Sequence, residues 1–233
     1  MRSTPDVTAP DLSAGLTLLH SPGPRSGAFY RLVGDALADA RGRVEWVDAR
    51  NAASTYALRA VAPSRALDGV RVARAFTAYQ HHELVRRVVR RVSPRTDLVV
   101  APNVASLYTD DDVPGHEADR LLSSTLATLA ELAAARSLPV LVTAGASGDD
   151  ATATVAAHAD AEIECAGTPL GVAFEADGYR PRGYWREGYW QTTLPYWVDL
   201  LGVAPGSVGR PRPEPDLEPR PERDPGSRAA TEG

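Results

Sequence analysis

Lysine is missing from this 233-residue chain, in which all 25 basic residues are arginine. This absence excludes a lysine that neutralises bound phosphates, a Schiff-base lysine and a lysine general base. Cys165 is the single cysteine, so disulfide scaffolds and cysteine zinc sites are also excluded. The residues around Cys165 alternate as in a strand, which predicts a buried and unreactive thiol. No apolar run approaches the roughly 20 residues of a membrane helix.

The chain also lacks a strong excess of positive or negative charge. The formal net charge is −5, which excludes a global field that draws the protein to nucleic acid or to an anionic membrane. The first residues do not form a signal-peptide pattern, so we expect a cytoplasmic protein with no membrane partner. With 43% hydrophobic residues, the chain is long enough for one sizeable domain with its own core.

Composition divides the chain into three parts. Residues 1–14 carry two prolines and no periodicity, and we expect a flexible arm. Residues 15–202 hold the apolar periodic segments and predict the folded core, with an aromatic segment at its end. Residues 203–233 are mostly proline, arginine, glutamate and glycine, which predicts a disordered tail.

The core alternates apolar strands with amphipathic helices. Strands are predicted at residues 16–19, 44–47, 70–76, 98–101 and 140–143, and helices from about 26 and at 53–61, 79–92 and 116–136. This alternation predicts an α/β fold with a mainly parallel central sheet flanked by helices. Residues 161–165 and 170–175 predict an antiparallel pair of C-terminal strands.

Residues 15–40 read as a strand, a loop rich in proline and glycine, and a helix, which is the architecture of a phosphate-binding P-loop. In the register of G-x-x-x-x-G-K-[ST], Pro22 replaces the first glycine, Ala28 the lysine and Phe29 the hydroxyl residue. Phe29 is expected to project bulk where a metal ion would sit, so we expect no cofactor and no metal. The degenerate loop comprises Pro22, Gly23, Arg25, Ser26, Gly27, Ala28 and Phe29.

Four segments extend this pattern along the chain. WVDARN (46–51), VARAF (72–76), residues 98–106 and residues 140–143 occur in an order and spacing that resembles the ATPase core of the RecA/RadA recombinase family, especially its archaeal paralogues. The resemblance covers about residues 15–175. It implies a RecA-like, P-loop-type core whose Walker A and Walker B motifs are degenerate.

The resemblance also implies which catalytic groups have been replaced. The family's activating glutamate matches Arg50, and its Walker B aspartate matches Pro102. The polar pair that senses the γ-phosphate matches Ala144 and Gly145. A cation cannot polarise an attacking water as a carboxylate does, and proline cannot hold Mg²⁺ through its side chain. We therefore expect no catalytic residue and no ATP hydrolysis.

Two DNA-related features of the family are expected to be weak or missing. Its disordered DNA-binding loop would lie within residues 145–159, which contain Asp149 and Asp150 but no arginine. Its N-terminal helix-hairpin-helix domain is not expected, because about fourteen residues precede the first predicted strand.

An aromatic segment near the C-terminus is the candidate interaction surface. Aromatic and arginine side chains interleave there, which suits packing over the sheet, a protein interface or single-stranded nucleic acid. Neighbouring acidic residues and the negative net charge weigh against nucleic acid. The residues are Tyr179, Arg180, Arg182, Tyr184, Trp185, Arg186, Tyr189 and Trp190.

Three further clusters are considered. The predicted helix 79–92 carries a basic face of Arg86, Arg87, Arg90 and Arg91, which predicts a solvated surface with acidic neighbours or a contact with DNA or an acidic partner. Residues 110–112 are all aspartate, which predicts a solvated turn and helix cap in place of a metal site. His81 and His82 are adjacent on a helix and should point in different directions, so joint metal binding is not expected.

These observations predict a catalytically inactive RecA/RadA-like paralogue. We expect an interaction or regulatory protein whose partner is another protein, such as a RadA-type recombinase, in DNA recombination or repair. One alternative is a nucleic-acid-binding module that uses Arg180, Arg182 and the arginine helix. Another is an enzyme with an unconventional nucleotide site around Arg25 and Arg50.

Overall fold

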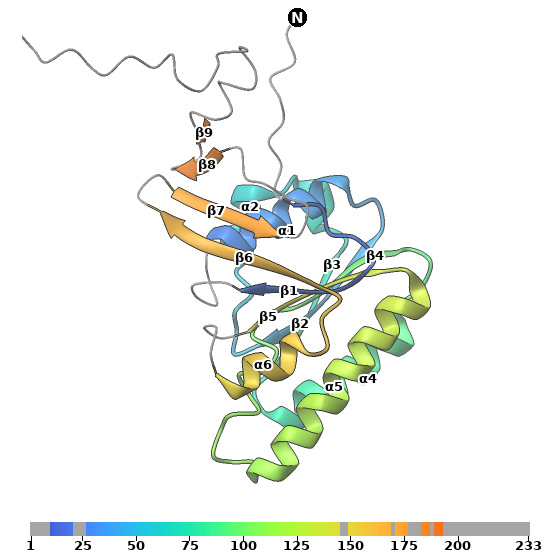
Figure 1. Cartoon of the computed structure of the whole chain (residues 1–233). Coiled ribbons are helices and arrows are strands. Elements are labelled where there is room, and N and C mark those ends of the chain that lie inside the picture. Colours follow the sequence, from blue (N-terminus) through green and yellow to red (C-terminus); the bar gives the residue numbers. More distant parts are fainter. Residues whose placement is uncertain are drawn as a thin grey trace, which may run out of the picture.

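The apolar strand segments lie side by side in one sheet (Figure 1). The computed structural model describes residues 10–20, 27–144, 149–168, 171–176, 183–186 and 189–192. Within them the strands are β1 (Gly15–His20), β2 (Arg43–Ala49), β3 (Val70–Ala75), β4 (Thr96–Ala101), β5 (Pro139–Ala144), β6 (Ala161–Thr168), β7 (Gly171–Ala176), β8 (Gly183–Arg186) and β9 (Tyr189–Thr192). The helices are α1 (Gly27–Asp39), α2 (Thr55–Val61), α3 (Ser64–Leu67), α4 (Ala78–Arg91), α5 (Gly115–Arg136) and α6 (Asp150–Ala156).

The sheet order is β3-β2-β4-β5-β1-β6-β7-β8-β9. Strands β1 to β6 are joined by parallel ladders, and the ladders from β6 to β9 are antiparallel. The predicted α/β class with a mainly parallel sheet is therefore confirmed, as is the antiparallel pairing of β6 with β7. Strand β6 pairs with β1 on its other side, so the direction of pairing changes at β6.

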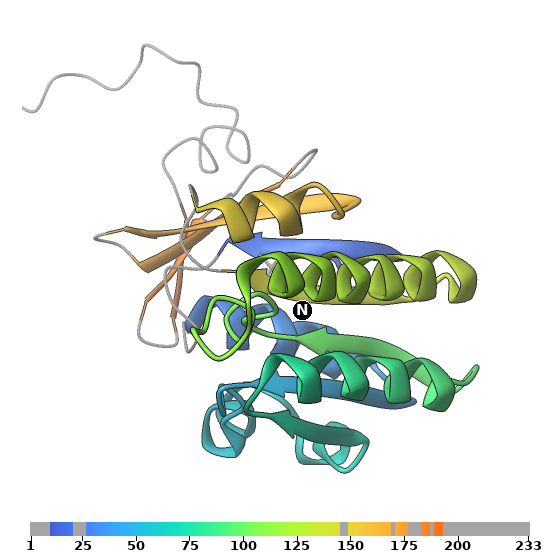
Figure 2. The same ribbon diagram turned by 90° about the horizontal axis from the view of Figure 1, so that it is seen from below.

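Helices cover both faces of the parallel part of the sheet (Figure 2). One apolar cluster joins β-strand side chains such as Leu16 and Leu18 to α4, α5 and α6. A second cluster joins Leu19 and Trp46 to α1, α2 and α3. Strand residues that alternate between these two clusters are buried on both faces, which explains the nearly continuous apolar runs of β1 and β4.

Two short helices fall where the sequence did not predict them. Helix α3 follows Pro63 directly, in a stretch that the sequence analysis left as a connection. Helix α6 occupies part of residues 145–159, within which a loop was expected, and residues 145–148 lie outside the described residues. Asp149 caps α6 by accepting a 2.5 Å hydrogen bond from the backbone N–H of Thr152, which explains why the acidic pair starts a helix.

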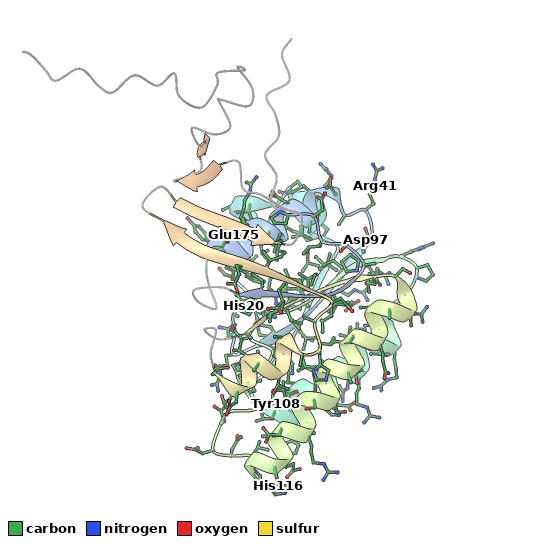
Figure 3. The ribbon with its side chains drawn as sticks, in the orientation of Figure 1. His20, Arg41, Asp97, Tyr108, His116 and Glu175 are labelled. Atoms are coloured by element: carbon green, nitrogen blue, oxygen red, sulfur yellow. The ribbon has the colours of Figure 1, made fainter. Side chains whose placement is uncertain are left out.

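The described part of the chain begins at Pro10 and ends at Thr192. Residues 1–9 and the predicted tail at 203–233 lie outside the described residues, while Leu12 packs against the α1 side of the core. At the amino ends of the strands, Asp97 accepts hydrogen bonds from the backbone N–H groups of Arg41 and Gly42, at 2.7 and 2.6 Å (Figure 3). Among the described helices, none is long and apolar enough to cross a membrane.

Gly34 permits the close packing of α1 on α2. A Cβ added there would lie 2.8 Å from the Cβ of Val61 and 2.9 Å from its carbonyl oxygen. We expect Gly34→Ala to lower the free energy of unfolding by about 1–3 kcal/mol, because α2 must shift to admit the methyl group. Gly27 in the same helix is the control, since its added Cβ meets nothing within 4 Å. Urea denaturation of both variants tests this: equal stability of the two would contradict it.

Candidate functional site at the carboxyl edge of the sheet

The described positions that were compared with nucleotide-hydrolysing proteins lie at one edge of the sheet. Strands β1, β2, β4 and β5 are parallel, so their carboxyl ends share that edge, which is where ligands bind in open α/β sheets. Arg50 follows β2, Pro102 follows β4, and Ala144 ends β5. Helix α1 begins at Gly27. The loop residues Pro22, Gly23, Arg25 and Ser26, and also Gly145, lie outside the described residues.

Phe29 belongs to the core and does not project toward a metal position, so that expectation is wrong. Its side chain is 1% exposed, and its ring lies 5.6 Å from the ring of Trp46 and 5.2 Å from that of Tyr30, both edge-on. Ala28 is equally buried. The first turn of α1 therefore presents apolar side chains to the sheet, because the helix is packed through these residues.

Asp48 is a buried carboxylate that shapes the turn after β2. Its side chain is fully buried; Oδ1 accepts hydrogen bonds from the N–H groups of Ala52 and Ala53, at 2.7 and 3.0 Å. Oδ2 accepts one from Nε of Arg74 at 3.2 Å. The sequence analysis gave Asp48 no role, whereas these hydrogen bonds show that its carboxylate is structural.

The turn after β2 is also attached to α1. The hydroxyl of Tyr30 donates a 2.5 Å hydrogen bond to the carbonyl oxygen of Ala52 and accepts a 3.0 Å hydrogen bond from the N–H of Ser54. Arg50 and Asn51 both adopt left-handed backbone conformations, with φ of 58° and 56°. This tight turn directs the Arg50 side chain across the edge toward β4.

Arg50 is engaged by the β4–α5 loop, which comprises residues 102–114. Its Nη2 donates to the carbonyl oxygen of Ser106 at 2.7 Å and forms an ion pair with Asp110. The side chain is 45% exposed, so the contact lies at the surface. The Arg50 guanidinium is thus held by a carboxylate of its own chain.

The same loop is anchored to the end of β5. The backbone N–H of Asn103 donates to Oγ1 of Thr143 at 2.8 Å, and that of Val104 donates to the Thr143 carbonyl at 2.9 Å. Pro102 is buried directly before this anchor. Pro102 therefore offers no side-chain ligand, and the two N–H groups that follow it are both bonded to Thr143.

His20 was missed by sequence reasoning, although it ends the central strand β1 (Figure 3). Its Nε2 lies 2.6 Å from Oε2 of Glu162 and 3.7 Å from Oε1 of Glu164. The alternation of residues 161–165 could have placed the two glutamates on one face. It could not show that β6 runs parallel to β1, which is what brings them to His20.

A second cluster of polar side chains lies where the β4–α5 loop meets helices α4 and α5. His81 Nδ1 is 2.9 Å from the hydroxyl of Tyr108, which is 2.9 Å from Oγ1 of Thr125, and His82 Nδ1 is 2.9 Å from the same Oγ1. The histidines reach different partners, as expected, yet both belong to one network. Burial lowers the pKa of His81 to about 4 and raises that of Tyr108 to about 12.

The basic face of α4 is organised around one carboxylate. Glu83 lies within 3.8 Å of Arg86, 3.1 Å of Arg87 and 3.4 Å of Arg90, and the hydrogen bond from Arg87 lowers the pKa of Glu83. Arg90 and Arg91 also stand in the last turn, where cations interact favourably with the helix dipole. The face is exposed and carries more positive than negative charge.

Residues 110–112 do not cap α5, which begins after Pro114 with no side-chain cap, so the predicted cap is wrong. Among the described residues no cluster of histidine, cysteine, aspartate or glutamate could hold a metal ion. Burial raises the pKa of the Cys165 thiol to about 11, as suits an unreactive cysteine.

The aromatic segment can be placed only through its backbone. Tyr179, Arg180 and Arg182 lie outside the described residues. Strands β8 and β9 form an antiparallel pair. In this pair Trp185 stands opposite Trp190, Tyr184 opposite Gln191, and Arg186 opposite Tyr189.

Strand β3 presents a surface that sequence reasoning also missed. It pairs with β2 alone among the described strands, so its outer edge is free there. Three large apolar side chains on or beside it are exposed: Val72 at 41%, Phe76 at 64% and Tyr79 at 47%. A hydrogen bond with Glu117 raises the pKa of the Tyr79 hydroxyl. The alternation of VARAF predicted a strand but could not show that it lies at an edge.

Asp48→Ala should cost about 3 kcal/mol of unfolding free energy, because two backbone N–H groups and the Arg74 guanidinium lose a buried acceptor. Asp110→Ala removes the exposed partner of Arg50 and should cost less than about 1 kcal/mol. Chemical denaturation of the two variants compares them directly. A cost for Asp48→Ala as small as that for Asp110→Ala would show that the turn does not depend on this carboxylate.

Two comparisons with known proteins complete the description of this edge. No protein-family model matches the chain, and no curated protein sequence matches it.

Proposed function

We propose that this chain is a catalytically inactive RecA/RadA-like protein that acts by binding another protein. The observation that carries the first half is that three compared positions among the described residues are used for internal structure. Arg50 is bonded to the β4–α5 loop, Pro102 is buried, and Phe29 packs on Trp46. Groups that hydrolyse a nucleoside triphosphate must face the substrate and Mg²⁺, and these side chains face their own chain.

The arrangement of the strands supports a RecA-like core. A strand, β1, leads through residues 21–26 to a helix, α1, that begins at the carboxyl edge of a parallel sheet. The positions matched to the activating glutamate and to the Walker B aspartate follow β2 and β4, whose parallel pairing makes them neighbours at that edge. A scaffold for phosphate chemistry needs this convergence.

The free edge of β3 supports the second half of the proposal. An edge strand presents unpaired N–H and C=O groups to which an extended segment of a partner can add. The exposed side chains of Val72, Phe76 and Tyr79 would supply apolar contact area, and aromatic residues are enriched at protein interfaces. A hollow of about 330 Å³ lies beside them, lined by Arg74, Tyr79, Gln80, Glu83, Leu84 and Arg87.

The resemblance stated above suggests which partner to test first. A paralogue that lacks hydrolysis can modulate an active assembly through contact alone, so a RadA-type recombinase from the same cells is the partner proposed. The aromatic segment around Trp185 and Trp190 remains the other candidate contact surface on this chain.

A nucleic-acid-binding role is a second candidate, and the basic face of α4 favours it. Three arginines share the single carboxylate of Glu83, and Arg91 adds a further exposed charge. Guanidinium groups spaced by one helical turn can contact successive phosphates. The net charge of −5 opposes such binding at long range, which places this candidate second.

Titration with a fluorescent ATP analogue, with and without Mg²⁺, should show no saturable binding at millimolar concentrations, because Arg50 is already bonded to the β4–α5 loop and the described residues form no cluster that could hold a metal ion. Hydrolysis above the rate of the buffer control is likewise not expected. Saturable binding that Arg50→Ala abolishes would replace this proposal with an unconventional nucleotide site.

Phe76→Ala should weaken binding of the recombinase partner about tenfold or more, as truncation of a central aromatic contact does. Tyr56→Ala is the matched control, since Tyr56 is 87% exposed but belongs to α2. Biosensor measurements with the immobilised chain provide both values, and thermal melting checks that the variants stay folded. Equal loss in both variants, or no loss in either, would rule out β3 as the contact surface.

The same immobilised chain can be probed with single-stranded DNA. Binding that weakens steeply with salt and is lost in Arg87→Ala, while the recombinase does not bind, would favour the second candidate.

A further inference from the structure

The directions of the hydrogen bonds in the His81 network follow from donor and acceptor counting. Thr125 Oγ1 donates its one proton to the carbonyl oxygen of Leu121 at 2.8 Å, so it must accept from both Tyr108 and His82. The Tyr108 hydroxyl, which donates to Thr125, must then accept from His81. His81 therefore carries its proton on Nδ1, and its Nε2 is an unprotonated acceptor.

Nε2 of His81 is buried and has no hydrogen-bond partner in the part of the chain that the structure describes. The His81 side chain is fully buried, and the Tyr108 ring packs edge-on against it with the ring centroids 5.6 Å apart. A proton added at Nε2 would create a buried cation whose new N–H has no acceptor. The closed arrangement is thus compatible with neutral His81 alone.

The carboxylates on the elements around α4 do not accept a hydrogen bond from His81 Nε2, because each interacts with another side chain. On α4 itself Glu83 binds the arginine face. From β2 and β3, Glu45 lies 3.9 Å from Arg71, and Asp48 pairs with Arg74. Glu117 of α5 is hydrogen-bonded to Tyr79, and the negative charge of Asp112, in the loop before α5, also raises the pKa of Tyr79. The titratable neighbours of His81 are then His82 on the same helix, which disfavours a second positive charge, and Tyr108 from the loop.

We propose that His81 and Tyr108 form a latch that acid opens: protonation of His81 releases the β4–α5 loop from α4 and α5, and with it the hold of that loop on Arg50. Tyr108 is the loop's side-chain hydrogen-bond link to both helices in the described structure, through His81 and Thr125. Ser106 and Asp110, which hold Arg50, lie within two residues of Tyr108 on either side.

The sign of the effect follows from linkage. In the open state His81 is in water and has its ordinary pKa near 6.5, whereas burial in the closed state lowers the pKa to about 4. Between these values the open state binds more protons, so acid favours opening. The closed-to-open ratio should be constant above about pH 6.5 and fall by up to about tenfold per pH unit toward pH 4.

Hydrogen–deuterium exchange with mass spectrometry tests this on the full chain, with rates corrected for the intrinsic effect of pH. Peptides that cover residues 104–113 should lose protection between pH 6.5 and 4.5, while peptides from residues 118–133 of α5 keep theirs. Simultaneous loss in both regions would mean acid unfolding of the whole domain and would overturn the latch. So would constant protection of residues 104–113.

Two variants separate His81 from other acid-sensitive groups. In His81→Asn the amide can still donate to Tyr108 but does not titrate, so residues 104–113 should keep one level of protection across the same pH range. His116→Asn is the control, since His116 is an exposed histidine in the first turn of α5, and it should behave as the wild type does. A pH response in His81→Asn equal to that of the wild type would assign the effect to another group.

Tyr108→Phe provides an independent readout at neutral pH. The ring remains but the hydroxyl is lost, so His81 Nδ1 and Thr125 lose their shared partner. Exchange of residues 104–113 at pH 7 should become several-fold faster while the α5 peptides stay unchanged. Unaltered exchange of the loop in this variant would contradict the latch even if the histidine variants behaved as expected.

Discussion

The buried carboxylate of Asp48 fixes the shape of the turn after β2, and the arrangement of the carboxyl edge depends on that turn. It replaces water as the acceptor for two consecutive N–H groups of the turn after β2, and it binds an arginine from the neighbouring strand. Because the turn is held in this way, Arg50 adopts a left-handed conformation and extends toward the β4–α5 loop. The contacts of Asp48 thereby determine which part of the structure the Arg50 side chain can contact.

The chain has arginine but no lysine, and several arginine side chains make internal contacts through the planar guanidinium group. Arg50 binds a carbonyl and a carboxylate at once, Arg74 reaches a buried aspartate from an exposed position, and three arginines of α4 surround Glu83. A guanidinium can satisfy several acceptors with fixed geometry, which an ammonium does less well. Arg50 and Arg74 thus stabilise the fold through internal contacts, whereas the arginines of α4 remain exposed to solvent.

The sequence predicted most of the sheet because strands buried on both faces leave an apolar signature that needs no knowledge of their neighbours. Residues 98–101 and 140–143 are such strands, and their helices followed from the spacing of Val85, Val88, Leu122 and Leu126. The candidate site was harder. That Phe29 faces Trp46, or that Glu162 lies beside His20, depends on which strands pair, and pairing is a tertiary property. Asp149 as a helix cap was readable in principle, but the family resemblance suggested a loop there.

The position of β1 in the middle of the sheet has a consequence for how the chain folds. This strand is the first of the described strands, yet its two neighbours are β5 and β6, and a hydrogen bond joins Leu16 to Asp160, 144 residues later. During synthesis β1 must wait for most of the domain to leave the ribosome before it can be enclosed. Contacts of such long range slow folding and leave an apolar strand exposed in the meantime. Until β5 and β6 have been made, β1 is therefore a segment open to aggregation.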